Sequence, residues 1–254
     1  MTRTQSVHLA YACLAFSMLA SDAAAQGIER DAHLEMSVDI SVTHTVLDRE
    51  GNVMLPTPVP AVFTVARGRR SGGWHTVVTY RTHRGTPTRS SSHPLDGARI
   101  EFDDTSGETR VYNASGELHS MLSNDSTGGL RVARGPEQWL EGLVATPDRR
   151  TARSRDLQEK YGKAVGRVGG LDRFVAHRED VVEEVLADPD SGLPVEINTA
   201  RHGDLEQHTV FGYERRSDGA WIRRTIRAEQ VLPGDSGQRA RLTVEFSNVS
   251  TGGR

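Results

Sequence analysis

The alternation of apolar and polar residues is most regular in residues 181–249, where it predicts a series of strands joined by short turns. Residues 181–187 are rich in β-branched side chains, which favour strands. After a break at residues 188–192, apolar residues alternate again at Leu193, Val195 and Ile197. A period of two is typical of a strand with one buried face. The break contains two aspartates, a proline and a glycine, so we expect a tight turn between antiparallel strands.

A hairpin signal in the same region sets the pairing of the next strands. Asp218-Gly219 is typical of a two-residue type I′ loop, in which both central residues have a positive φ. A two-residue loop at this position places Phe211 opposite Ile226 in the predicted hairpin. Ile226 in turn shares a face with apolar residues of the last strand. The predicted apolar residues cross four antiparallel strands at Val195, Phe211, Ile226 and Phe246.

The other face of these strands is predicted to be exposed to solvent, because its residues are polar. They are Arg223, Thr225, Arg227, Arg241, Thr243 and Glu245. The apolar face has to be covered, since an exposed patch of that size is rare on a soluble monomer. Residues 136–144 offer a cover, because Pro136 can begin a helix and apolar residues follow it at helical spacing. These apolar residues are Trp139, Leu140, Leu143 and Val144.

The rest of the chain adds a second helix and further strands. Residues 151–163 are charged, and Leu157 and Tyr161 are four positions apart, which is the spacing of neighbours on a helix. Residues 33–47 alternate like a long strand with one wet face, and short β-rich runs separated by turns follow up to residue 122. The expected fold is therefore mainly β, with one or two helices inserted around residues 136–163.

Residues 1–25 are predicted to be a secretory signal peptide. A basic start precedes an apolar run at residues 9–20, and Ala23-Ala-Ala25 supplies the small residues of a cleavage site. The run is shorter than the roughly 20 residues that a membrane-spanning helix needs. The sole cysteine, Cys13, lies in this segment, so the mature chain would have no disulfide and no thiolate metal ligand. We expect one domain at residues 26–254 that is periplasmic or secreted and does not span the membrane.

No group of residues predicts catalysis, a metal site or a cofactor. The net charge is −3 with both signs interspersed, which argues against a nucleic-acid partner. Gly234-Asp-Ser-Gly237 resembles the nucleophile loop of chymotrypsin-like proteases, but too little chain follows it to build a specificity pocket. Glu183 and Glu184 are neighbours on a predicted strand and therefore point to opposite faces. The histidines nearest to metal-ligand spacing have no paired carboxylates: His75, His83 and His93.

Four short motifs resemble those of periplasmic lipoprotein-carrier and outer-membrane lipoprotein-sorting proteins. These motifs are Asp188-Pro-Asp-Ser-Gly-Leu-Pro-Val195, Phe211-Gly-Tyr213, Asp218-Gly-Ala-Trp221 and Arg227-Ala-Glu229. The resemblance implies a curved antiparallel sheet, shaped like a half-barrel, with helices over its concave apolar side.

Two functions agree with these observations. The first is a non-enzymatic periplasmic protein that binds a lipid, an acyl chain or a hydrophobic peptide segment on the concave face. Its predicted ligand-binding residues are Val195, Phe211, Ile226, Phe246 and Trp139. The second is a structural or protein-interaction module whose concave face is filled by its own helices and takes no small-molecule ligand. An open apolar cavity would favour the first function, and a filled core with an exposed apolar edge would favour the second.

The N-terminal pattern predicts cleavage after Ala25, which leaves Gln26 as the first residue of the exported protein. N-terminal sequencing of protein from the periplasmic fraction measures this directly. Protein from that fraction that still begins at Met1 would contradict the prediction.

Overall fold

The computed structural model describes residues 35–54, 61–70, 73–81, 97–103, 106–123, 140, 142–232 and 237–252. Most of these residues lie in strands. The strands are β1 (Met36–Leu47), β2 (Ala61–Arg70), β3 (Gly73–Arg81), β4 (Arg99–Asp103), β5 (Glu108–Tyr112), β6 (Leu118–Ser123), β7 (Val144–Ala145), β8 (Gly166–Val168), β9 (Leu171–Arg178), β10 (Val181–Ala187), β11 (Pro194–Arg201), β12 (Asp204–Arg215), β13 (Trp221–Val231) and β14 (Arg239–Thr251). A short 3-10 helix, η2 (Pro147–Arg149), leads into the helix α3 (Arg150–Tyr161).

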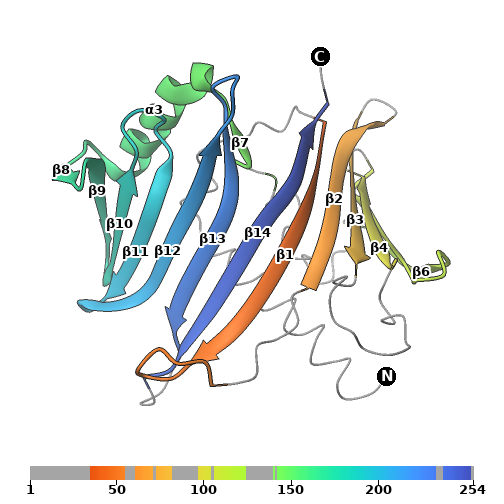
Figure 1. Ribbon diagram of the computed structural model, residues 1–254, viewed down its shortest axis with the longest axis horizontal. Coiled ribbons are helices and arrows are strands. Elements are labelled where there is room, and N and C mark those ends of the chain that lie inside the picture. The colour runs from red at the N-terminus through yellow and green to blue at the C-terminus, as the bar shows by residue number, and fades with distance from the viewer. Residues whose placement is uncertain are drawn as a thin grey trace.

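All the described strands belong to one antiparallel sheet (Figure 1). Its order is β6-β5-β4-β3-β2-β1-β14-β13-β12-β11-β10-β9-β8, and β7 pairs separately with β13. Strands β1 to β6 form one meander, and strands β8 to β14 form another. The two meanders meet where β1 pairs with β14, in a ladder that runs from Met36↔Thr251 to Leu47↔Arg239. Residues from opposite ends of the chain therefore build the middle of the sheet.

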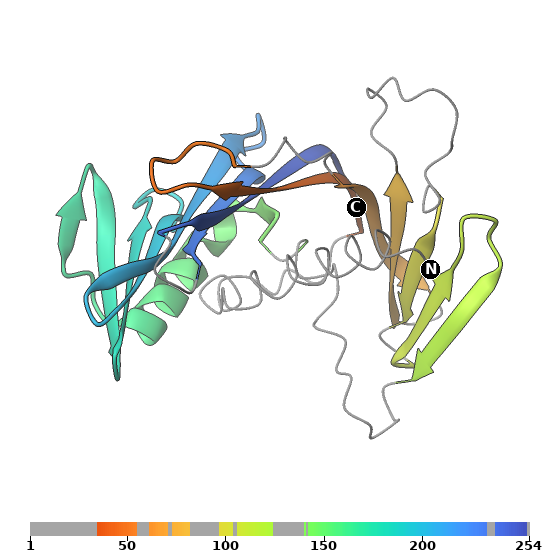
Figure 2. The same cartoon turned by 90° about the horizontal axis from the view of Figure 1, so that it is seen from below.

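The sheet is open and strongly curved. Figure 2 shows it as an arch, with α3 and β7 on the inner side. The buried apolar residues of β1, β2, β13 and β14 form a single core together with residues of α3 and β7. The predicted fold is therefore confirmed: it is mainly β, with a half-barrel-like antiparallel sheet and a helix on the concave side.

The turn at residues 188–192 has the hydrogen bonds that its sequence predicts. The carboxylate of Asp188 accepts one hydrogen bond from the backbone N–H of Ser191 at 3.0 Å and another from the Ser191 hydroxyl at 2.5 Å. The N–H of Gly192 donates to the carbonyl oxygen of Asp188 at 2.8 Å. Gly192 has a φ of 71°, which explains why glycine stands there.

Helix α3 is attached to this turn by a buried arginine. The guanidinium of Arg153 donates to the carbonyl oxygen of Ser191 and to that of Thr146, each at 2.9 Å. Further along the helix, Leu157 and Tyr161 are buried in the core, as their spacing predicts. The second predicted helix is thus confirmed, and its first turns are held between η2 and the turn before β11.

The loop between β12 and β13 has three residues rather than the predicted two. The N–H of Arg216 donates to the carbonyl oxygen of Ala220 at 2.7 Å, and the N–H of Gly219 donates to the carbonyl oxygen of Arg216 at 3.0 Å. Gly219 has a φ of 85°, but Asp218 does not have a positive φ. The type I′ prediction is therefore wrong, and the loop is of the three-residue kind with glycine in the left-handed region.

A β-bulge restores the predicted pairing of Phe211 with Ile226. The register shifts by one residue just after Gly212 pairs with Thr225. A Cβ atom at position 212 would lie 2.3 Å from the Oγ1 atom of Thr225, so a larger residue would require the Thr225 side chain to move. Bulges re-aim the side chains that follow them. Arg223, which was expected on the exposed face, is buried for this reason.

The φ of 85° at Gly219 predicts that Gly219→Val destabilises the protein. A β-branched residue is strained there by about 1–3 kcal/mol, and its Cβ atom would lie 3.3 Å from the Cγ atom of Pro147. Chemical denaturation measures the loss in free energy of unfolding. Gly166→Val in β8 is the control, because Gly166 lacks a positive φ and its added Cβ would meet nothing within 4 Å. Equal losses for both variants would contradict the assigned turn.

Candidate functional site

The buried apolar residues form one continuous cluster on the concave face. Its centre can be followed across four strands through the pairing register. Phe211 pairs with Ile226, Ile226 with Val244, and Val244 with Val42. We call these four residues the apolar row. The first three are at most 5% exposed, whereas Val42 is only partly buried, so the row is covered at one end and partly open at the other.

Three of the predicted site residues lie in this cluster. Phe211 and Ile226 belong to the apolar row itself, as the sequence predicts. Phe246 lies two residues beyond Val244 on β14, opposite Ile40, and is also buried. The structure therefore brings these three side chains to one face of the sheet.

Val195 does not join them, which corrects the sequence prediction. The ladder between β10 and β11 steps from Leu186↔Glu196 to Ala187↔Pro194, so Val195 has no opposite residue. Its side chain is partly buried and lies outside the apolar cluster. Ile197 is the residue of β11 that belongs to the cluster.

Residues 140 and 142–145 lie over part of the concave face, and we call them the covering segment. Leu140, Leu143 and Val144 are buried in the apolar cluster. The sequence predicts this packing from their spacing. Trp139, the remaining predicted site residue, lies outside the described residues.

The covering segment joins the sheet as a short strand, although a helix was predicted up to Val144. β7 pairs with β13 over two residue pairs, one of which is Val144↔Ile222. The N–H of Arg223 also donates to the carbonyl oxygen of Leu143 at 2.8 Å. This pairing places the covering segment beside the end of β13, where β13 no longer pairs with β14.

Arg223 lies between the covering segment and the apolar row. Its guanidinium carbon is 5.2 Å from the centre of the Phe211 ring and 5.9 Å from that of Tyr213, in the range of a cation–π contact. On its other side, a Cβ atom at position 142 would lie 2.9 Å from the Nη2 atom, so Gly142 allows this close approach. The sequence pattern missed this arrangement. A signal for it is Gly212, because a glycine inside a strand often marks a bulge.

The concave face stays partly exposed beyond the covering segment. Apolar residues that are partly buried and pack against the cluster are Val42, Phe63, Phe102, Ala176, Tyr213, Ala228 and Val249. The rings of Phe63 and Tyr80 meet edge to face, with their centres 5.4 Å apart. The apolar surface therefore continues on both sides of the buried centre.

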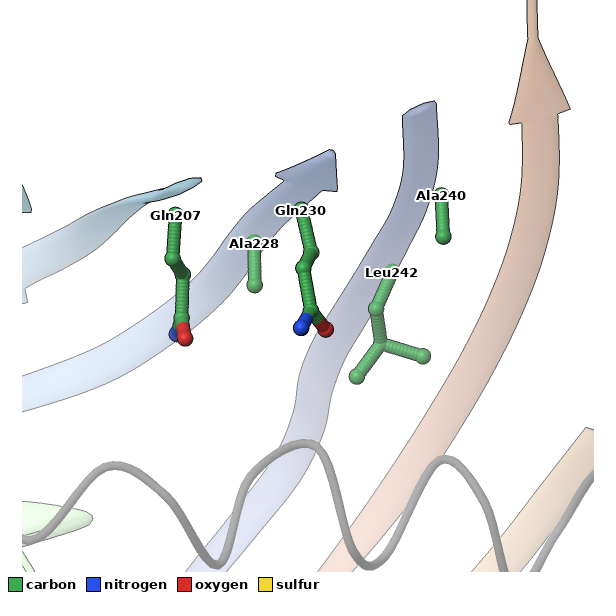
Figure 3. Close-up of a pocket in the computed structure, with 5 residues that line it drawn as sticks. All are labelled: Gln207, Ala228, Gln230, Ala240 and Leu242. Carbon is green, nitrogen blue, oxygen red and sulfur yellow. The ribbon is translucent and has the colours of Figure 1, made fainter. Parts of the chain in front are cut away.

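One end of the concave face contains polar side chains that the sequence analysis did not select. A small hollow there has an enclosed volume of about 10 Å³, which is room for one water-sized group. Figure 3 shows the residues that line it: Gln207, Ala228, Gln230, Ala240 and Leu242. His44 pairs with Leu242, and burial lowers the pKa of its imidazole, so this histidine is neutral at pH 7.

The part of the chain that the structure describes contains no group of three metal-ligating side chains. Glu183 accepts a hydrogen bond from Tyr161, whereas Glu184 accepts one from Arg173. The two carboxylates therefore lie on opposite faces of the sheet, as expected. His83, His93 and most of residues 234–237 lie outside the described residues. None of the described helices has the length and apolar character needed to cross a bilayer.

No protein-family model matches the sequence, and no curated protein is significantly similar to it. Comparison with solved structures finds a LolA superfamily protein from Nitrosomonas europaea, with 12% identity, a TM-score of 0.41 and coverage of 89% of each chain. A β-barrel-like protein of a domain of unknown function from Brucella abortus has 11% identity and a TM-score of 0.29, and the match covers 87% of this chain and 98% of that chain. The Pseudomonas aeruginosa MucA/MucB complex has 13% identity and a TM-score of 0.24, over 92% of this chain and 99% of that chain. All three matches have identities of 13% or less and TM-scores below 0.5, so no residue role is transferred from them.

The positions of Phe211 and Val195 predict different costs of truncation. Phe211→Ala should lower the free energy of unfolding by about 3–5 kcal/mol, as for other buried phenylalanines. Val195→Ala should cost about 1 kcal/mol or less, because its side chain is only partly buried and lies outside the cluster. Denaturant titration followed by circular dichroism gives both values. A similar loss for the two variants would contradict this placement.

Proposed function

We propose that this protein is an exported, non-enzymatic binding protein that holds a lipid, an acyl chain or a hydrophobic peptide segment on its concave face. The observation that carries the proposal is the continuity of the apolar surface, which runs from the covered end of the apolar row to partly exposed residues such as Val42 and Phe63. Contiguous apolar surface that stays partly exposed is typical of an interaction site. The ligand would contact Phe211, Ile226 and Phe246 where it reaches the buried part, with Trp139 as a further contact.

Movement of the covering segment would give a ligand access to the buried part. β7 contains only two residues, and one further backbone hydrogen bond joins Leu143 to Arg223. Short ladders of this kind open locally at a fraction of the free energy of global unfolding. Helix α3, in contrast, is held by the buried guanidinium of Arg153. A ligand can therefore displace the covering segment while α3 stays in place.

Export is part of this proposal and rests on the sequence. The basic, apolar and small-residue regions of residues 1–25 are those of a signal peptide. Removal of that segment leaves a mature chain without cysteine, whose fold depends on its packed core. The periplasm is the compartment that we propose.

A protein-interaction module with a closed concave face is the second candidate. Phe211, Ile226 and Val244 are buried, and the hollow at the polar end of the concave face is only about 10 Å³ in enclosed volume. Exposed apolar side chains stand instead on β6, at one edge of the described sheet, where Leu118 is 54% and Met121 is 56% exposed. Edge strands of this kind pair readily with another chain. Such a module would bind its partner at the edge and would take no ligand on the concave face.

A reversible disulfide between the covering segment and β13 tests the first candidate. Val144 and Ile222 are opposite each other in an antiparallel ladder, where Cα atoms are about 4.5–5.5 Å apart and within reach of a disulfide. The mature Val144→Cys/Ile222→Cys variant would have no third thiol, because Cys13 lies in the predicted signal peptide. We expect the oxidised variant to bind the uncharged fluorescent probe N-phenyl-1-naphthylamine at least about tenfold more weakly than the reduced variant, because the segment can no longer move.

The control is a disulfide on the opposite face, made by Thr225→Cys/Glu245→Cys, since Thr225 and Glu245 are paired and exposed. Its oxidation should leave probe binding unchanged. Equal binding by the oxidised and reduced forms of the first variant would show that the covering segment does not gate the site. Absence of probe binding by the unmodified protein would overturn the binding function and leave the interaction module.

A further inference from the structure

The concave face becomes more polar along its strands, away from the apolar row. Two residues further along each strand, the register aligns a middle row of Thr209, Ala228, Leu242 and His44. Two residues beyond that, it aligns an amide row of Gln207, Gln230, Ala240 and Val46. At about 3.4 Å per residue, the amide row lies about 14 Å from the apolar row. The concave face therefore has an apolar centre and a polar end, like the two parts of an amphiphile.

Two glutamine side chains lie on neighbouring strands at the polar end. Gln207 and Gln230 are paired across β12 and β13, and Figure 3 shows both projecting to the same side as Leu242. The Nε2 atom of Gln207 donates to the hydroxyl of Thr209 at 3.2 Å, which orients that amide on the concave face. The Gln230 side chain makes no hydrogen bond with the residues that the structure describes. A primary amide offers two donors and an acceptor, so Gln230 has hydrogen-bonding capacity for a ligand.

The described residues of the amide and middle rows carry no formal charge at neutral pH. His44 is held in its neutral form by burial, which lowers its pKa. Glu229 and Arg241 flank these rows in sequence, but they face away and pair with each other, with 2.8 Å between the Arg241 Nε and Glu229 Oε1 atoms. A charged head group in the hollow would lose hydration without gaining a counter-ion, whereas a carbonyl or hydroxyl group would gain hydrogen bonds.

We propose that Gln207 and Gln230 form a subsite for the uncharged ester or amide group of an acyl amphiphile, whose hydrocarbon chain extends across the middle row to the apolar row. This inference rests on the proposed function and adds the chemical class of the ligand. The small size of the hollow agrees with a single carbonyl or hydroxyl group between the two amides. Ala228 and Leu242 line the same hollow and would contact the first carbons of the chain; Leu242 is only 2% exposed, so the chain would reach it once this part of the face is uncovered.

Competition against N-phenyl-1-naphthylamine tests the subsite. The competitors are 1-monooleoylglycerol, which is uncharged, and oleate, which has the same chain and a carboxylate. We expect the unmodified protein to prefer monooleoylglycerol by about tenfold. Gln230→Leu should weaken monooleoylglycerol about fivefold, the loss expected for one neutral hydrogen bond, and should leave oleate and the probe unchanged. Gln158→Leu, on the exposed face of α3, is the matched control and should change none of the three affinities.

The possible outcomes separate this inference from the proposed function. If the probe binds but oleate competes as well as monooleoylglycerol, and Gln230→Leu alters neither, the amide subsite is wrong and the apolar site stands. If oleate is preferred, the head group is anionic and the subsite is again wrong. If the probe does not bind to the unmodified protein, both proposals are overturned. The midpoint temperature of thermal unfolding is measured for Gln230→Leu and for the unmodified protein. Equal midpoints would show that a changed affinity is not caused by misfolding.

Discussion

An open sheet with one apolar face is stable in water only if something covers that face. In this protein the face is long, because the ladder between β1 and β14 joins two meanders into one surface. α3 and the covering segment protect the half formed by the C-terminal meander, where Phe211, Ile226 and Val244 are buried. The surface continues into partly exposed residues of the other meander, including Phe63 and Phe102. Val38 and Val65 of that meander are themselves buried, so the proposed site for an apolar ligand rests on the partly exposed residues beside the core and not on a difference between the two halves.

Arg223 of β13 contacts the covering segment within otherwise apolar surroundings. The bulge at Gly212 turns Arg223 to the concave side, where its guanidinium lies over the ring of Phe211. The backbone of the same arginine binds Leu143, and Gly142 leaves room for its side chain. The backbone hydrogen bond to Leu143 and the close approach of Gly142 to the guanidinium fix the position of the segment beside β13. The segment is thus specifically placed, although its ladder with β13 is short.

Much of the architecture follows from residue patterns, and the exceptions have identifiable causes. Strand alternation predicts the sheet, and the spacing of Leu157 and Tyr161 predicts α3. The predicted pairing of Phe211 with Ile226 is correct, although the loop was predicted with two residues and has three. The extra loop residue shifts the register by one, and the bulge at Gly212 shifts it back by one. The error remains visible at Arg223, which lies between the loop and the bulge.

The candidate site was less accessible to sequence analysis than the fold. Val195 alternates correctly with the apolar residues of its strand, but an irregularity between β10 and β11 removes it from the cluster. The neighbouring Pro194 is a signal for it, because proline inside a strand often marks a bulge. Gln207 and Gln230 alternate correctly with the apolar residues of their strands, yet a polar residue at such a position attracts attention only once the register is known. Both cases depend on the exact pairing register, which a one-residue irregularity changes.

Native mass spectrometry of protein purified from the periplasm would test most directly whether the concave face holds a ligand. If it does, the spectrum should contain a species heavier than the processed polypeptide by the mass of a neutral acyl compound, which is released on collisional activation. A spectrum with the bare polypeptide mass alone, unchanged after incubation with monooleoylglycerol, would contradict a ligand-binding concave face.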